Sequence, residues 1–262
     1  MLKKEIDINS FDTVLFDLDG TLYIGSERVP GANRLVELLK DLKKRVFFTT
    51  NNSTKTRYQI YERLVKFGIH AKLEEVLTSG YIAADYAIRT NMKDIYIFGS
   101  TNLIHEFEKM GIVVNQNTDA ENLLIGYDPS MTYEDLTRAV QVAINAKCII
   151  ACNKERVYPG NNGLLLPGCG AMTAPVEWCA NKQCDLVIGK PNTMMVEFIE
   201  HHYAVERERV LIVGDTLESD VEMANRAGCQ SILISDKSDG NVFSLPSIID
   251  IYNYFKEQVT LC

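Results

Sequence analysis

The sequence predicts an α/β protein with a doubly wound parallel sheet, into which a second α/β domain is inserted. Three observations lead to this fold class. Short apolar runs that end in turn residues alternate with segments of helical periodicity, as in parallel sheets covered by helices. The 262 residues are enough for one large domain or two modest ones, and 46% of them are hydrophobic, which suffices for a real core. The composition of the sequence changes in its middle, which contains a segment rich in glycine and proline.

Apolar runs toward the two ends of the chain predict the strands of the parallel sheet. They cover residues 13–16, 45–48, 186–188, 210–213 and 231–234. Segments of helical period lie between them and predict helices over residues 32–41, 54–67, 194–201 and 221–227. Strands and helices in alternation are typical of a parallel sheet.

The middle of the chain predicts the inserted unit. Further strands are expected at residues 95–98, 122–126 and 148–151, and a long helix at residues 132–145. Residues 158–170 contain too much glycine and proline to be regular throughout. We therefore expect a discontinuous core formed by residues 1–80 and 183–262, with the inserted α/β domain at residues 81–182.

The charge balance excludes several classes of partner. Lysine and arginine number 27 against 35 acidic residues, so the formal charge is −8, and neither nucleic acid nor an anionic membrane is an expected partner. Nor does any stretch approach the roughly 18 apolar residues of a membrane helix. The first residues lack the apolar segment of a secretory signal, and we therefore expect a cytoplasmic protein.

Carboxylates follow two of the predicted strands. Asp17 ends the first apolar run, and Asp19 comes two residues later, so an extended chain points both carboxylates to the same side. Such crowding is costly unless a cation such as Mg²⁺ lies between the acids or one of them holds a proton. A simple turn is the alternative interpretation. Asp215 and Asp220 follow a second strand, and Asp220 could also cap the helix expected at residues 221–227.

Two further strand ends carry groups that suit a phosphate. Thr50, Asn51 and Asn52 offer hydroxyls, amides and the N–H groups of a helix start, although a capped helix start alone would look the same. Lys190 precedes Pro191, which fixes the turn, and so can place one positive charge over an anion.

These four segments, in this order, resemble the motifs of the haloacid dehalogenase (HAD) superfamily of phosphohydrolases. The motifs read DLDGT from Asp17, TNN from Thr50, GKP from Gly189 and GDTLESD from Gly214. The phrases PGA, GYDPSMTYEDL and PGCGAM are similar to those of the NagD-like, or nitrophenyl-phosphatase-like, branch. That branch has a large α/β cap and includes phosphoglycolate and pyridoxal phosphate phosphatases.

The resemblance implies a role for each matching residue. Asp17 would be the nucleophile that forms an aspartyl phosphate, and Asp19 would be the general acid and base. Mg²⁺ would be held by Asp17, the backbone carbonyl of Asp19, Asp215 and, directly or through water, Asp220. The phosphate would be bound by Leu18, Thr50, Asn51, Asn52 and Lys190.

The implied function is a Mg²⁺-dependent phosphatase that hydrolyses a small phosphorylated metabolite. Two alternatives use the same fold: a protein that only binds or senses a phosphorylated ligand, and a phosphotransferase that uses a sugar hydroxyl in place of water. Relatives of this branch often pair through their caps, so a homodimer is expected. Gly168, Cys169 and Gly170 form a candidate substrate loop of the cap, or a tight turn that enters a helix.

The chain departs from the family pattern at three places. Thr216 stands where relatives have an arginine that braces the site, and the segment ACNKE at residues 151–155 replaces a phrase near ATNPD. The segment SDKSDGN at residues 235–241 replaces a loop that usually contains glycine. Because all four acids remain, the resemblance still implies intact chemistry.

Overall fold

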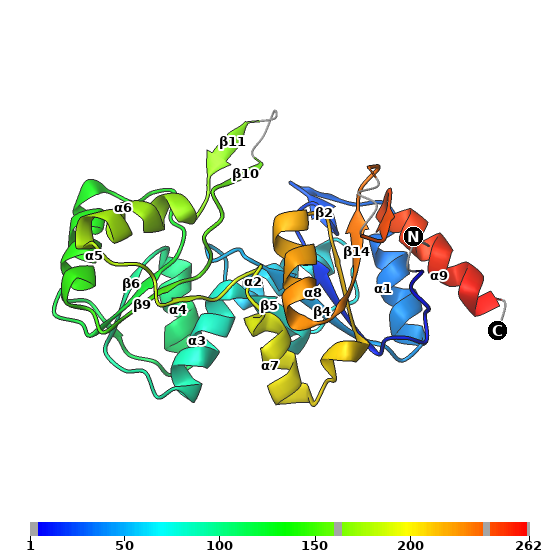
Figure 1. Ribbon diagram of the computed structural model, residues 1–262, viewed down its shortest axis with the longest axis horizontal. Helices are drawn as coiled ribbons and strands as arrows, with labels where there is room; N and C mark the ends of the chain where they lie inside the picture. Colours follow the sequence, from blue (N-terminus) through cyan, green and yellow to red (C-terminus); the bar gives the residue numbers. More distant parts are fainter. Residues whose placement is uncertain (1–4, 160–163, 238–241, 261–262) are drawn as a thin grey trace. The chain divides into compact units, whose positions relative to one another are not determined.

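The computed structural model describes residues 5–159, 164–237 and 242–260 (Figure 1). These residues fold into two compact units. Of the described residues, the first unit comprises 5–50, 60–77, 190–237 and 242–260, and the second comprises 51–59, 78–159 and 164–189. Part of the departing segment at residues 235–241 lies outside the described residues.

The first unit is built on a sheet of six strands in the order β15-β14-β13-β1-β4-β5, of which β15, β14, β13, β1 and β4 are parallel. The strands are β1 (Thr13–Asp17), β4 (Arg45–Thr50), β5 (Val76–Thr78), β13 (Val210–Gly214), β14 (Gln230–Ile234) and β15 (Ser244–Leu245). From β1 the chain adds β4 and β5 on one side, and later β13, β14 and β15 on the other. The sheet is therefore doubly wound, and ligands of such sheets bind beyond the strand ends where the winding reverses.

Helices, a ribbon and short turns complete the first unit. The helices are α1 (Ala32–Asp41), α2 (Arg57–Lys66), α7 (Met194–Tyr203), α8 (Glu222–Ala227) and α9 (Ile248–Thr260). A two-stranded antiparallel ribbon of β2 (Tyr23–Ile24) and β3 (Glu27–Arg28) follows β1. Single turns cover Leu73–Glu75 and Arg207–Arg209, and a wider π turn covers Leu217–Val221.

The core of the first unit lies around β1. All five residues of β1 are buried, which explains why this strand reads as a continuous apolar run. Phe16 belongs to one buried cluster with Leu35 and Leu39 of α1 and Phe255 of α9. This packing fixes β1 and thereby the place where its last residue, Asp17, meets the edge of the sheet.

The second unit has its own parallel sheet, of five strands in the order β12-β9-β8-β6-β7. These are β6 (Ile95–Phe98), β7 (Val114–Asn115), β8 (Asn122–Ile125), β9 (Cys148–Ala151) and β12 (Leu186–Val187). The helices are α3 (Ser79–Arg89), α4 (Thr101–Lys109), α5 (Tyr133–Asn145) and α6 (Gly170–Ala180). An antiparallel ribbon of β10 (Val157–Pro159) and β11 (Leu165–Pro167) can be followed in Figure 1. Apolar residues from the sheet, α5 and α6 form a separate core.

The predicted α/β fold with parallel sheets is confirmed, and one strand belongs elsewhere than expected. The apolar run at residues 186–188 was expected in the core sheet. Instead β12 pairs with β9 of the second sheet, with Leu186 opposite Ile150 and Val187 opposite Ala151. Apolarity predicts that such a strand is buried but does not say against which neighbour. Within the described residues, no helix is both long and apolar enough to cross a membrane.

We expect Phe255→Ala to destabilise the first unit by about 3–5 kcal/mol, because it leaves a cavity where a fully buried ring contacts Phe11. Asn253→Ala, on the exposed side of the same helix, should change the free energy of unfolding by less than about 0.5 kcal/mol. Urea unfolding followed by circular dichroism measures both. Equal effects of the two substitutions would contradict the position assigned to α9 in the core.

Candidate active site

Three buried charged residues meet at the carboxyl end of β1. Asp17 is the last residue of this central strand, and Lys190 contacts its Oδ1 atom. The Lys190 Nζ atom also lies 2.7 Å from Asp220 Oδ1. The exposed fractions are 7% for Asp17, 3% for Lys190 and 2% for Asp220. Because isolated charges are very costly to bury, these three side chains depend on one another.

Asp215 extends this group into a cluster of three carboxylates. It follows β13, which pairs directly with β1, so the two strand ends lie side by side. One oxygen each of Asp17, Asp215 and Asp220 lie within 4.8 Å of one another, an arrangement that can hold a metal ion. With Lys190 protonated, the three ionised carboxylates leave a formal charge of −2, which a divalent cation would neutralise.

Two glycines make room for these carboxylates. Gly20 has a φ of +96°, and a Cβ atom at this position would overlap Asp215 Oδ2. Gly214 ends β13, and a Cβ atom there would overlap the carboxylate of Asp220. The cluster is therefore closed by backbone on two sides.

The helix-cap interpretation of Asp220 is wrong. Asp220 lies within the π turn at Leu217–Val221, and no side chain caps α8. Its Oδ2 atom accepts a hydrogen bond from the backbone N–H of Thr216 at 3.2 Å, while Oδ1 accepts from Lys190. The added residue of the wide turn directs the carboxylate back toward Lys190. Thr216, in the place of the expected arginine, contacts Asp215 Oδ1 through its hydroxyl at 3.3 Å.

Burial and mutual repulsion disfavour the simultaneous ionisation of the carboxyl groups in this cluster. Burial raises the pKa of Asp17 well above its ordinary value, and Asp220 and Asp215 raise it further against the opposing effect of Lys190. The pKa of Asp215 is also raised, by burial and by Asp220. Burial alone would lower the pKa of Lys190, but Asp17 and Asp220 raise it above its usual range. The lysine therefore stays protonated, and additional positive charge would favour the ionised acids.

Asp19 lies outside this carboxylate cluster. Its side chain is 53% exposed, whereas Asp17 is buried. The hydroxyl of Tyr23 donates to Asp19 Oδ2 at 3.4 Å, and Arg63 Nη1 lies 4.0 Å from Oδ1. Burial raises the pKa of Asp19, while Arg63 and Tyr23 lower it. Tyr23 and Arg63 were missed at the sequence level, since Arg63 belongs to no motif and is brought here by α2.

The predicted phosphate-binding residues fall into two groups. Thr50 ends β4 and is buried, and the side chain of Leu18 is fully buried, so that only the backbone of Leu18 could reach a ligand. Asn51 belongs to the second unit, where its amide donates to Glu155 at 2.8 Å. Asn52 Oδ1 accepts from the backbone N–H groups of Thr54 and Lys55, before α2 begins at Arg57, so it forms a turn and not the helix cap of the alternative interpretation. Phosphate binding by these residues stays a prediction.

The glycine segment of the second unit is a tight turn. The N–H of Gly170 donates to the carbonyl of Glu155 at 2.8 Å, and a Cβ atom on Gly168 would overlap that carbonyl oxygen. Cys169 is 2% exposed, and its thiol faces the carbonyl of Ile125. The glycines are thus required by backbone packing, and the Cys169 side chain belongs to the interior. A substrate contact of this loop stays a prediction.

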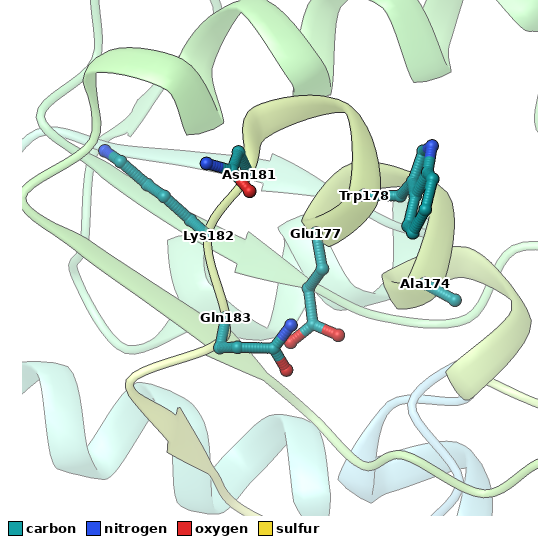
Figure 2. A pocket seen from close by; sticks show the side chains of 6 residues that line it. All are labelled: Ala174, Glu177, Trp178, Asn181, Lys182 and Gln183. Atoms are coloured by element: carbon teal, nitrogen blue, oxygen red, sulfur yellow. The ribbon is translucent and has the colours of Figure 1, made fainter.

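A separate surface cavity of about 380 Å³ lies in the second unit, at the end of α6 (Figure 2). Trp178 and Glu177 line it, and Glu177 is held by Lys154 at 2.8 Å. The remaining lining residues are Ala174, Asn181, Lys182 and Gln183. None of the predicted site residues lines this cavity.

Two related families of hydrolases match separate parts of this chain. The haloacid dehalogenase-like hydrolase family matches residues 14–113, and a HAD hydrolase-like family matches residues 187–240. The 4-nitrophenylphosphatase of Schizosaccharomyces pombe is 29% identical, over 87% of this chain and 84% of that protein. The glycerol-3-phosphate phosphatase of Rattus norvegicus is 30% identical, over 85% of this chain and 78% of that protein.

Solved structures agree with these relatives. The crystal structure of a 4-nitrophenylphosphatase from Thermotoga maritima has a TM-score of 0.88 at 28% identity, and covers 95% of this chain and 98% of that one. A further relative by sequence, a sugar phosphatase of Bacillus subtilis, is also 28% identical, over 84% of this chain and 82% of that protein. The chain therefore belongs to the haloacid dehalogenase-like hydrolases and is one of the phosphoric monoester hydrolases of that family.

Proposed function

We propose that the protein hydrolyses a small phosphomonoester with Mg²⁺ through a phosphorylated Asp17. The observation that carries this proposal is the buried contact of Asp17 with Lys190 beside two further carboxylates, at the reversal point of a doubly wound sheet. The named relatives act on 4-nitrophenyl phosphate, glycerol 3-phosphate or sugar phosphates. These compounds share the phosphate group but not the rest of the molecule.

The donor set of the cluster suits Mg²⁺. Carboxylate oxygens are hard ligands of the kind that this ion prefers, and the formal charge of −2 matches it. Asp17, Asp215 and the backbone carbonyl of Asp19 would hold the ion. Both oxygens of Asp220 already accept hydrogen bonds, so Asp220 would act through Lys190 or through water. The bound ion would supply positive charge next to the phosphoryl oxygens.

Asp17 and Asp19 divide the chemistry between them. A carboxylate oxygen of Asp17 forms a bond to phosphorus while the ester P–O bond breaks, and its electron pair passes to the leaving oxygen, which Asp19 protonates. The resulting Asp19 carboxylate then takes a proton from water as the water oxygen bonds to phosphorus. The bond between Asp17 and phosphorus breaks, and inorganic phosphate leaves. Lys190, Thr50, Asn51, Asn52 and the backbone of Leu18 would hold the phosphoryl oxygens.

The inserted domain supports a small substrate. In this proposal the expected core of residues 1–80 and 183–262 carries the chemistry, except that residues 183–189 belong to the second unit through β12. Residues 81–182 act as a cap that excludes water and large esters. A homodimer through the cap and a cytoplasmic location stay predictions. Phosphate sensing without turnover would need neither the nucleophile nor the acid, so the pair Asp17 and Asp19 favours an enzyme. Transfer to a sugar hydroxyl would differ only in the acceptor that reaches the intermediate.

Asp17→Asn should abolish phosphate release. The amide cannot form the acyl phosphate, and the loss in kcat is expected to be roughly 10³-fold or more. The measurement is phosphate release from 4-nitrophenyl phosphate, glycerol 3-phosphate and a panel of sugar phosphates, with Mg²⁺ and with chelator. Asp12→Asn, one residue before the opposite end of β1, is the control and should retain activity.

Three results would decide against the proposal or between its alternatives. Activity of Asp17→Asn equal to that of the parent would refute the assigned nucleophile. A parent chain that binds Mg²⁺ and phosphate but releases nothing from any ester favours the sensing protein. If added sugar raises the release of 4-nitrophenol without a matching rise in inorganic phosphate, and a new phosphorylated sugar forms, the result favours the phosphotransferase.

Gly20→Ala should remove Mg²⁺ binding without unfolding the chain. A Cβ atom at position 20 would displace Asp215, and the positive φ adds backbone strain of about 1 kcal/mol. The melting temperature of the parent should rise with Mg²⁺, and that of the variant should not. Gly25→Ala is a matched control, because Gly25 also has a positive φ but has no heavy atom within 4 Å of a built Cβ. Loss of the Mg²⁺ response in both variants would contradict the metal position.

A further inference from the structure

Two side chains contact the Asp19 carboxylate, one at each of its oxygens. The Tyr23 hydroxyl donates to Oδ2 at 3.4 Å, and the Arg63 guanidinium lies 4.0 Å from Oδ1. With a half-exposed side chain, Asp19 is free of the tight packing that fixes Asp17. Its orientation therefore depends on these two neighbours.

Arg63 is itself held in place by three contacts. Its guanidinium lies over the ring of Tyr23, 4.0 Å from the ring centroid, and 5.6 Å from the ring centroid of Phe67. It also donates a hydrogen bond to the backbone carbonyl of Gly25, in the turn of the β2–β3 ribbon. A stacked, hydrogen-bonded guanidinium loses little further freedom when it contacts a carboxylate. Arg63 thus links α2, the ribbon and Asp19.

Tyr23 is equally fixed. It is fully buried, and its ring centroid lies 5.4 Å from that of Phe67. Its carbonyl accepts the N–H of Gly20 at 2.9 Å, which closes the turn that contains Asp19. Because the ring is fixed, its hydroxyl is fixed too, and the hydrogen bond to this hydroxyl favours one orientation of the Asp19 carboxylate.

We propose that Arg63 and Tyr23 are positioning residues that hold the Asp19 carboxyl where it delivers a proton to the leaving oxygen. This inference rests on the proposed function, in which Asp19 is the general acid. The proton passes from the Asp19 carboxyl to the ester oxygen as the P–O bond breaks, and Asp19 becomes a carboxylate. Arg63 stabilises that new negative charge, and the Tyr23 hydroxyl keeps one oxygen turned away from solvent.

The role predicts a dependence on the leaving group. A basic leaving group needs the proton of Asp19, whereas 4-nitrophenolate leaves as a stable anion. Phenyl phosphate and 4-nitrophenyl phosphate differ by one nitro group and so compare the two cases. A general acid contributes roughly 10²–10⁴-fold, and loss of one positioning group should remove part of that factor.

We expect Arg63→Gln to lower kcat/KM for phenyl phosphate by about tenfold, and for 4-nitrophenyl phosphate by less than about threefold. Tyr23→Phe, which keeps the buried ring, should shift the ratio in the same direction and provides the same test if Arg63→Gln does not fold. Asp19→Asn sets the upper limit of the shift. Arg28→Gln is the matched control, since Arg28 donates to the carbonyl of Phe67 and should leave the ratio unchanged.

Equal losses on both esters in Arg63→Gln and Tyr23→Phe would overturn the positioning role and leave a purely structural one. Unchanged kcat/KM values in both variants would overturn it as well. Failure of the proposed function looks different: the parent chain would then release phosphate from neither ester with Mg²⁺, and this inference would fall with it.

Discussion

The buried ion pair between Lys190 and Asp17 is the interaction on which the rest of the site depends. Each charge would be very costly to bury alone, and Asp220 and Asp215 add further negative charge around the same ammonium. Burying the charged side chains of Lys190, Asp17 and Asp220 costs folding free energy, so their presence is better explained by function than by stability. Breaking one member would leave uncompensated charge on the others.

The sheet is the device that brings these residues together. Asp17 ends β1 and Asp215 follows the neighbouring parallel strand β13, so their carboxylates meet at one edge although they are far apart in the sequence. Gly20 and Gly214 leave space for two of the carboxylates, and the π turn aims Asp220 inward. The same edge carries the Asp19 turn, which Tyr23 and Arg63 hold from the side. Rigid backbone therefore fixes the buried acids, while side chains fix the exposed one.

Local signals made much of this predictable. The buried run before Asp17 and the acids after two strands indicated the sheet edge, because parallel strands end on the same side. Sequence did not reveal that residues 186–187 pair with β9 or that Asp220 bonds to Thr216, since each depends on the three-dimensional arrangement of the chain. Arg63 was invisible for the same reason. It reaches Asp19 only because α2 packs against the ribbon that follows β1.

The central claim is that phosphate passes through Asp17, and trapping the phosphorylated side chain tests it most directly. The enzyme would be quenched with acid during turnover of 4-nitrophenyl phosphate and reduced with borohydride, which converts an aspartyl phosphate to homoserine. Peptide mass spectrometry then reads the modified position. The account predicts homoserine at position 17 and an unmodified Asp19. Homoserine at position 19, or turnover without any modified aspartate, would contradict it.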